Sequence, residues 1–248
     1  MPDRREQEPR VSPGASSVTW LGRLYIWATY RLYDEFAWAY DFVSWLVSLG
    51  RWSGWRLSAL DQITGQRVLE VGFGTGELLS EMAMRGLEPV GLDASPAMHR
   101  VTARKLARRA LDVPRVSGVV QTMPFPDESF DSIVCTFPAG YILEPATLCE
   151  TARVLRLPDP ATGKGGGRLV VVGLVVAIDV PAWRRAMQFL FGVQGGAVLE
   201  RFAGLAQAAG LQVDILEQGN GRTRVPVAVA ERQYPCNSPE CSTSGSCT

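Results

Sequence analysis

Three glycines follow a short apolar run in alternate positions, at Gly72, Gly74 and Gly76. The run, residues 68–71, has the length and branching of a buried parallel strand. Glycine has no Cβ, so these positions can take a positive φ and let a small molecule lie against the backbone. A helix that starts after Gly76 presents free N–H groups at its first turn. The strand, the glycine turn and the helix together predict a cofactor-binding site.

The spacing of the glycines favours a nucleoside without phosphates over a dinucleotide. A dinucleotide fingerprint reads G-x-G-x-x-G, whereas this chain has Glu77 where the third glycine belongs. A second expected strand, residues 87–92, leads directly to Asp93. A carboxylate at the tip of the neighbouring strand can accept hydrogen bonds from both hydroxyls of a ribose. We therefore expect a ribose at Asp93 and no pyrophosphate at the glycine turn.

Four motifs, in one order and at one spacing, resemble those of the class I S-adenosylmethionine-dependent methyltransferases. They are Glu70-Val-Gly-Phe-Gly-Thr-Gly76, Val90-Gly-Leu-Asp-Ala-Ser-Pro-Ala-Met98, Met123-Pro-Phe-Pro-Asp-Glu-Ser-Phe-Asp131, and Arg153-Val-Leu-Arg156 leading to Gly165-Gly-Gly-Arg-Leu-Val-Val-Val172. The resemblance runs from about residue 36 to about residue 231. A shorter likeness, to the branch that includes the ubiquinone/menaquinone biosynthesis C-methyltransferases, lies in Phe36-Ala-Trp-Ala-Tyr-Asp41, Ser48-Leu-Gly50 and Trp55.

This resemblance implies S-adenosylmethionine as the cofactor and assigns expected roles to the matching residues. The first motif would run under the methionine part of the cofactor, with Glu70 near its amino acid end. Asp93 would hold the ribose, and Ala94 and Met98 would lie along the ribose or the adenine. The residues expected to contact the cofactor are Glu70, Gly72, Phe73, Gly74, Gly76, Asp93, Ala94, Met98, Val120, Gln121 and Phe137.

One position departs from the family pattern at the adenine end. Many relatives have an aspartate there that meets the adenine amino group, and this chain has Val119. We expect the backbone of Val120, helped by Gln121, to contact the adenine instead. Phe137 is expected to wall the cofactor or an apolar acceptor, with a plain core role as the alternative. The segment 136–138 lacks the Asn/Asp-Pro-Pro-aromatic tetrad of amino-group methylases that act on nucleic-acid bases, which disfavours adenine methylation.

Methyl transfer from a sulfonium is an in-line displacement that needs neither a covalent intermediate nor a metal. No metal site is therefore predicted. A phenol or quinol acceptor would still require a base. His99, the only histidine, is expected on the surface behind the second strand. The candidate bases are Asp41, Tyr40 and Tyr141, and Tyr40 could equally be a cofactor lid contact.

The elements that carry these residues alternate strand and helix, which indicates an α/β fold. We predict a doubly wound, mostly parallel seven-stranded sheet, the Rossmann-like methyltransferase fold, with an N-terminal helical cap. Helices are expected to include 95–111 and 145–155. Strands are expected at 67–71, 87–92, 115–120, 129–135, 168–174, 211–217 and 224–231. The last two would form a closing antiparallel pair, joined by a turn at Gly219-Asn-Gly221.

Composition divides the chain into four predicted parts. Residues 1–17 are expected to be a disordered tail, 61–233 the S-adenosylmethionine-binding domain, and 234–248 a disordered Cys/Ser-rich tail. Residues 18–60 hold six of the seven tryptophans and are expected to form an aromatic-rich helical cap. The aromatic face of this cap is expected to pack on the sheet, to contact a lipid interface or greasy substrate, or both.

Charge and hydropathy limit the partners and the location. Lys+Arg and Asp+Glu both number 25, so no large positive field gathers nucleic acid. No apolar run reaches 18 residues, and the first ten residues lack the apolar region of a signal peptide. A cytoplasmic location is expected, with peripheral membrane contact through 18–60 as an option. Arg100, Arg104, Lys105, Arg108 and Arg109 form a basic stripe that is either a solvated face or a contact for anionic lipid.

The sequence therefore predicts an S-adenosylmethionine-dependent methyltransferase that acts on a small lipophilic acceptor, either a quinone precursor or a lipid-like molecule. Three alternatives stay open. The chain could methylate oxygen or nitrogen of a polar metabolite, or it could be an inactive cofactor-binding partner subunit. The third alternative, an NAD(P)-dependent oxidoreductase, is disfavoured by Glu77 at the position of the missing glycine. It is also disfavoured because the chain has no Tyr-x-x-x-Lys catalytic pair: neither of its two lysines, Lys105 and Lys164, has a tyrosine four residues before it.

Overall fold

The computed structural model describes residues 57–138, 140–162, 165–174, 177–178, 195–218 and 223–233 of the 248-residue chain. Both predicted tails and the cap up to residue 56 lie outside the described residues. The candidate bases Tyr40 and Asp41 and the predicted turn at Gly219-Asn-Gly221 lie outside them as well.

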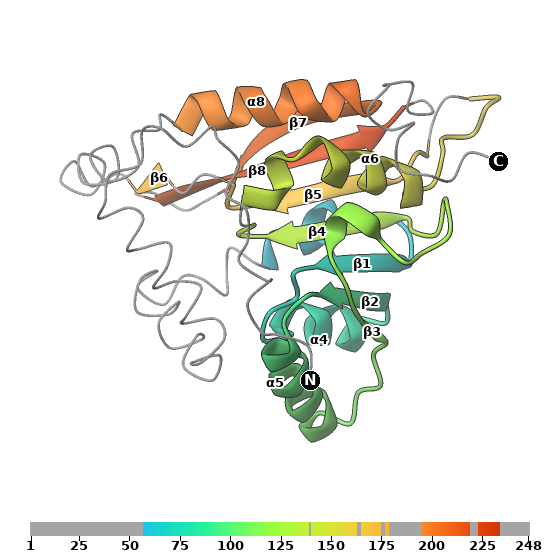
Figure 1. Ribbon diagram of the computed structural model, residues 1–248, viewed down its shortest axis with the longest axis vertical. Coiled ribbons are helices and arrows are strands. Elements are labelled where there is room, and N and C mark those ends of the chain that lie inside the picture. Colours follow the sequence, from blue (N-terminus) through green and yellow to red (C-terminus); the bar gives the residue numbers. More distant parts are fainter. Residues whose placement is uncertain are drawn as a thin grey trace, which may run out of the picture.

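A mixed sheet forms the centre of the described part of the chain. Its strands are β1 (Arg67–Val71), β2 (Glu88–Asp93), β3 (Arg115–Ser117), β4 (Ser132–Thr136), β5 (Arg168–Val172), β6 (Ala177–Ile178), β7 (Leu211–Gln218) and β8 (Thr223–Arg232). The order is β3-β2-β1-β4-β5-β8, with β7 paired to β8 at the edge and β6 paired to the start of β8 (Figure 1). The first five strands of this order are parallel, and β8 runs antiparallel to β5, β6 and β7. The predicted mostly parallel sheet with an antiparallel closing pair is confirmed.

Helices cover both faces of this sheet, as a doubly wound fold requires. They are α4 (Glu77–Met84), α5 (Pro96–Arg108), α6 (Pro145–Val154) and α8 (Gly195–Ala208), with 3-10 turns η1 (Leu60–Gln62), η2 (Val120–Thr122) and η3 (Gly140–Leu143). Alternate residues of β1 enter different core clusters: Val68 packs with side chains of α4 and α5, and Leu69 packs with side chains of α6 and α8. This alternation follows from the two-residue period of a strand.

Several element boundaries differ from the predicted ones for local reasons. The third strand ends at Ser117 instead of residue 120, because the chain turns at Val119 into η2. The fourth begins at Ser132 instead of residue 129, because Phe130 forms an isolated bridge to Leu155 and the chain bends at Asp131. Helix α5 ends at Arg108, and Ala110 follows with a φ of 53°. The two-residue strand β6 was not predicted.

The parallel strands β1, β2 and β4 end at one edge of the sheet. Their carboxyl ends lead to the glycine loop 72–76, to Ala94 and to Phe137. In open α/β sheets, ligands bind in the crevice outside the carboxyl ends of the strands. The topology therefore brings the predicted motifs to one edge, where a shared ligand could meet them.

Candidate cofactor-binding site

The loop between β1 and α4 is built on three left-handed glycines. Gly72, Gly74 and Gly76 have φ values of 67°, 52° and 72°, which residues with a Cβ rarely adopt. The Gly72 N–H donates to the carbonyl oxygen of Leu92 at 2.7 Å, which ties the start of the loop to β2. Gly76 is the N-cap of α4 and has no side chain, so it offers no side-chain acceptor to the first N–H groups of α4.

One glycine of this loop has no described neighbour where a Cβ would stand, and the other two have one. Around the position of a Cβ on Gly74, no heavy atom of the described residues lies within 4 Å. A Cβ on Gly72 would meet the Tyr141 hydroxyl at 2.9 Å, and one on Gly76 would stand 2.4 Å from Thr102. Gly76 is therefore required for packing on α5, whereas Gly74 forms an open cradle. The cradle fits a ligand that lies directly on the peptide backbone.

Asp93 links the two loops at this edge. One carboxylate oxygen accepts the Gly74 N–H at 2.9 Å, and the other accepts the Ser95 N–H at 2.8 Å. Burial raises the pKa of Asp93 above the ordinary value of 3.8, and the hydrogen bonds from Ser95 and Gly74 oppose the rise. An ionised carboxylate has about four lone-pair sites, so two remain for the hydroxyls of a ribose. The acid thus orders the cradle and keeps the capacity to hold a sugar.

Two polar residues of α5 that were not predicted as site residues also brace this edge. The Thr102 hydroxyl donates to the Gly74 carbonyl oxygen at 2.8 Å. His99 Nε2 lies 3.0 Å from the Asp93 carbonyl oxygen, and its ring packs edge-to-face on Phe73 with centroids 4.8 Å apart. The expectation of a surface histidine was therefore wrong: His99 is half-buried between the two loops. A polar residue on the buried face of a predicted helix was the signal that could have found both.

Four predicted cofactor residues have buried side chains: Glu70, Phe73, Met98 and Val120. Glu70 is 2 % exposed on β1. Phe73 is 3 % exposed and packs so closely on Gly91 that a Cβ there would stand 2.6 Å from its ring. Met98, expected along the ribose or the adenine, is 1 % exposed in the core cluster of α4 and α5. At Phe73 and Met98 the apolar side chain is therefore a packing group.

The expected adenine end lies beyond β3. Ala94 and Val119 are exposed, and Val120 is buried at the start of η2. The side-chain amide of Gln121 donates to the Glu144 carboxylate at 2.9 Å. The amide expected to help at the adenine is therefore engaged with the residue that follows η3, and Val119 presents an apolar side chain at the surface.

The expected methyl end lies after β4. Phe137 takes a φ of 52°, a strained conformation for a residue with a side chain, and its N–H donates to the Val172 carbonyl oxygen at 2.7 Å. Its ring packs where a Cβ on Gly173 would stand, at 2.3 Å. Backbone strain of this kind persists only where the surrounding structure maintains it, and it clusters at functional sites.

Tyr141 is the candidate base that falls within the described residues. Its hydroxyl lies 3.2 Å from the Cys135 thiol and borders Gly72 at the start of the glycine loop. Burial raises the pKa of Cys135 to about 12, so the thiol stays protonated and is not a nucleophile. The structure thus brings Tyr141, Gly72, Gly74 and Asp93 to one edge.

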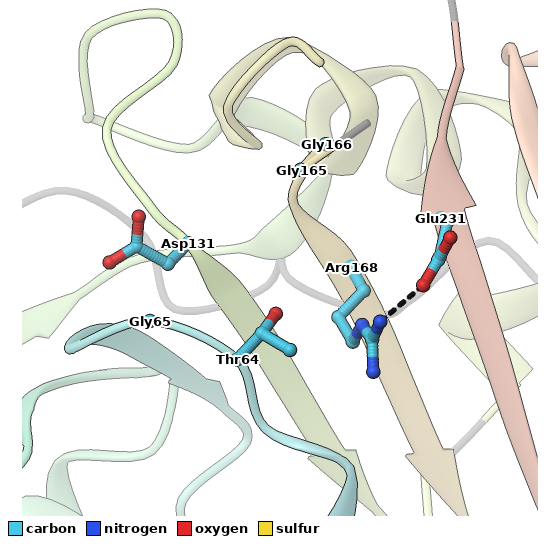
Figure 2. A pocket seen from close by; sticks show the side chains of 7 residues that line it. All are labelled: Thr64, Gly65, Asp131, Gly165, Gly166, Arg168 and Glu231. Carbon is cyan, nitrogen blue, oxygen red and sulfur yellow. Dashed lines mark hydrogen bonds and ion pairs between the residues drawn. The ribbon is translucent and has the colours of Figure 1, made fainter. Parts of the chain in front are cut away.

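A hollow of about 260 Å³ lies at the opposite edge of the sheet. Its lining residues are Thr64, Gly65, Asp131, Gly165, Gly166, Arg168 and Glu231. Figure 2 shows Arg168 reaching across to Glu231 within it. These residues sit at the amino ends of β1, β4 and β5, apart from Glu231 near the carboxyl end of the antiparallel β8, so the hollow is separate from the predicted site. Within the described ranges, no group of three or more His, Cys, Asp or Glu side chains could hold a metal ion.

Comparisons with known proteins agree with this geometry. A family described as a methyltransferase domain matches residues 68–157. The demethylmenaquinone methyltransferase of Paenarthrobacter aurescens is 33% identical over 156 residues, or 62% of this chain and 57% of that protein. The chain therefore spans a little over half the length of that relative. The protein of the same name from Thermus thermophilus is 31% identical over 181 residues, or 66% of this chain and 77% of that protein.

A solved structure supports the fold. It is described as a SAM-dependent methyltransferase, possible histamine N-methyltransferase, from Thermotoga maritima. It matches with a TM-score of 0.56 at 17% identity, and the match covers 82% of this chain and 98% of that one.

Proposed function

The chain belongs to the class I S-adenosylmethionine-dependent methyltransferases, in the branch that resembles quinone C-methyltransferases, and from that membership we propose that it methylates a small lipophilic acceptor, a quinone precursor. The observation that carries this proposal is the 181-residue match, which covers 77% of a demethylmenaquinone methyltransferase. The proposed catalytic unit is residues 61–233. Family membership sets the nicotinamide alternative aside.

The open cradle at Gly74 and the carboxylate of Asp93 support S-adenosylmethionine as the cofactor. When bound, this cofactor supplies an electrophilic methyl group on a sulfonium. Asp93 would accept the ribose hydroxyls while it holds the Gly74 and Ser95 N–H groups. The strained Phe137 would wall the site on the β4 side and exclude water from it. Most of the acceleration would come from holding the acceptor carbon near the methyl group.

The base for a quinol acceptor is proposed outside the described residues. Tyr141 borders Gly72, which places its hydroxyl near the loop expected under the methionine part of the cofactor. Its neighbour is the protonated thiol of Cys135, which cannot take up a proton from it. We therefore assign Tyr141 to positioning the loop, and Tyr40 and Asp41 stay the candidates for the base.

The test is a methyl-transfer assay with the full chain. S-adenosylmethionine is supplied with a demethylated naphthoquinol carrying an isoprenoid tail, and in parallel with catechol and with histamine. We expect a product about 14 mass units heavier from the naphthoquinol alone, because a methyl group replaces a hydrogen. Transfer to catechol or histamine without transfer to the quinol would reject the proposed acceptor. Cofactor binding without transfer to any lipophilic quinol would favour the inactive partner subunit.

A methyl group added at Gly74 is expected to block the cofactor without unfolding the protein. Gly74→Ala places a Cβ in the open cradle, and overpacking against a bound ligand costs about 2 kcal/mol, or about thirtyfold in the Kd of S-adenosylhomocysteine. The left-handed φ itself costs about 1 kcal/mol of stability.

Gly86→Ala is the matched control for this change. Gly86 has a φ of 79°, and no described heavy atom lies within 4 Å of the position of its Cβ, but it follows the far end of α4. The stability of Gly86→Ala should fall by the same amount as that of Gly74→Ala, with the Kd of S-adenosylhomocysteine unchanged. Equal Kd values for the two variants would show that no ligand lies on Gly74.

Cofactor affinity is expected to fall on acidification from a higher pH than an exposed aspartate would give. Ribose hydroxyls donate to the ionised Asp93, so binding is full above the pKa of this group and is lost as the pH drops through it. Burial has raised the pKa of Asp93 above 3.8, so the loss of cofactor binding begins at a higher pH. A raised folded-state pKa means that the folded chain takes up this proton more readily than the unfolded chain. Protonation of Asp93 therefore raises the free energy of unfolding as the pH falls through its pKa, and this contribution is lost as the pH rises again. Calorimetric titration with S-adenosylhomocysteine, with circular dichroism at each pH, separates lost binding from unfolding.

A further inference from the structure

Helix α5 presents a row of three exposed arginines, Arg100, Arg104 and Arg108, here called the arginine row. The spacing i, i+4, i+8 places them on one side of the helix. The buried residues of α5, chiefly Met98, Thr102 and Leu106, lie on the opposite side. The arginine row therefore faces away from the sheet.

No ion pair among the described residues involves the arginine row, and this distinguishes it from its neighbours. Lys105 of α5 and Arg109, the residue that follows this helix, both pair with Glu77 of α4, at 3.3 Å and 3.1 Å. Residues 96–111 contain no acid. Like charges at i and i+4 repel each other, so the row works against helix stability in the isolated chain. Packing within the described part of the protein thus gives no reason for the row.

The composition of this face indicates what it contacts. Between the arginines lie Ala103 and Ala107, whose small side chains let the helix approach a flat surface closely. No aromatic side chain lies on this face to stack on a nucleic-acid base, and the whole chain has zero net charge. Phosphate groups spread over a plane complement three separate cations without any built pocket. We propose that the arginine row docks the protein on an anionic phospholipid bilayer.

The same helix holds the cofactor-binding edge from its inner side. Thr102 donates to Gly74, and His99 contacts the Asp93 carbonyl oxygen. Helix α5 begins at Pro96, three residues after Asp93. A docked α5 therefore holds the cofactor-binding edge at the bilayer surface. The inference uses no property of the methyl acceptor.

The test measures partitioning of the full chain onto vesicles by co-sedimentation. Vesicles of phosphatidylcholine with phosphatidylglycerol are compared with phosphatidylcholine alone. We expect binding to the anionic vesicles that weakens as salt is raised. The triple variant Arg100→Gln, Arg104→Gln, Arg108→Gln should lower the partition coefficient about a hundredfold, and Arg104→Gln alone about fivefold.

Arg201→Gln is the matched control for Arg104→Gln. Arg201 is also an exposed arginine on a helix, but α8 covers the other face of the sheet, so its loss should change partitioning less than about twofold. Unchanged partitioning of the triple variant would overturn the proposal and assign any membrane contact to another segment, such as 18–60. Tighter binding to mixed-sequence RNA than to anionic vesicles, lost in the triple variant, would also overturn it. Since the readout is partitioning, a failed methyl-transfer assay leaves this inference untouched.

Discussion

Asp93→Asn is expected to weaken the binding of S-adenosylhomocysteine about a thousandfold while the protein stays folded. The carboxylate would accept hydrogen bonds from two hydroxyls of the ribose. Each hydrogen bond to a charged group contributes about 2 kcal/mol, so the loss of both corresponds to about a thousandfold in Kd. The amide also turns a donor toward the Ser95 N–H or the Gly74 N–H, both of which need an acceptor. We therefore expect Asp93→Asn to weaken both the ribose contact and the hydrogen bonds that order the loop around Gly74. Calorimetric titration gives the Kd directly.

The stability of this variant should change little. Burial penalises the charged form of Asp93, as its raised pKa shows, so removing the charge offsets part of the lost hydrogen bonding. Asp112→Asn makes the same chemical change at an exposed position in the loop after α5, and its Kd should match that of the natural chain. A Kd for Asp93→Asn within threefold of the control, on the order of 0.6 kcal/mol, would show that the ribose lies elsewhere.

The parts of the fold that sequence predicts well are those fixed by local chemistry. Strand β1 was predicted at Arg67–Val71 and is found there, because an apolar run ends abruptly at glycines that cannot extend it. The three glycines of the loop all take positive φ, as their spacing implied. The antiparallel closing pair β7 and β8 was also predicted, since two alternating segments flank a tight-turn signal.

The contacts that sequence did not predict join elements far apart in the chain. Thr102 reaches Gly74 across 28 positions, and Gln121 reaches Glu144 across 23. The contact between Cys135 and Tyr141 is the exception, since it joins consecutive elements, and it depends on how η3 folds back on β4. Periodicity reveals which face of a helix is buried, but not which polar atom on that face meets a loop. The site could therefore be located from the sequence, whereas its bracing residues could not.

Arg153→Met is expected to lower the free energy of unfolding by about 3 kcal/mol, the largest stability loss predicted for this chain. The guanidinium of Arg153 donates to both carboxylate oxygens of Glu150 at 2.8 Å, and to the carbonyl oxygens of Met123 and Phe125. Hydrogen bonds from Arg153 to Glu150 raise the pKa of the guanidinium, so it stays charged. Glu150 is 5 % exposed, so removal of its partner leaves a buried carboxylate without a cation. Chemical denaturation measures the loss.

Two further variants, one at Arg156 and one that also replaces Glu150, test whether the stability loss comes from the unpaired buried charge. Arg156→Met makes the same change three residues on, where an exposed guanidinium pairs with Asp131, and it should cost less than about 1 kcal/mol. Replacing Glu150 and Arg153 together by methionine should cost less than Arg153→Met alone, because no unpaired charge remains. If the double replacement cost more than the single one, the segment Met123–Asp127 would depend on its backbone hydrogen bonds to Glu150 and Arg153, and not on the compensation of the buried charge.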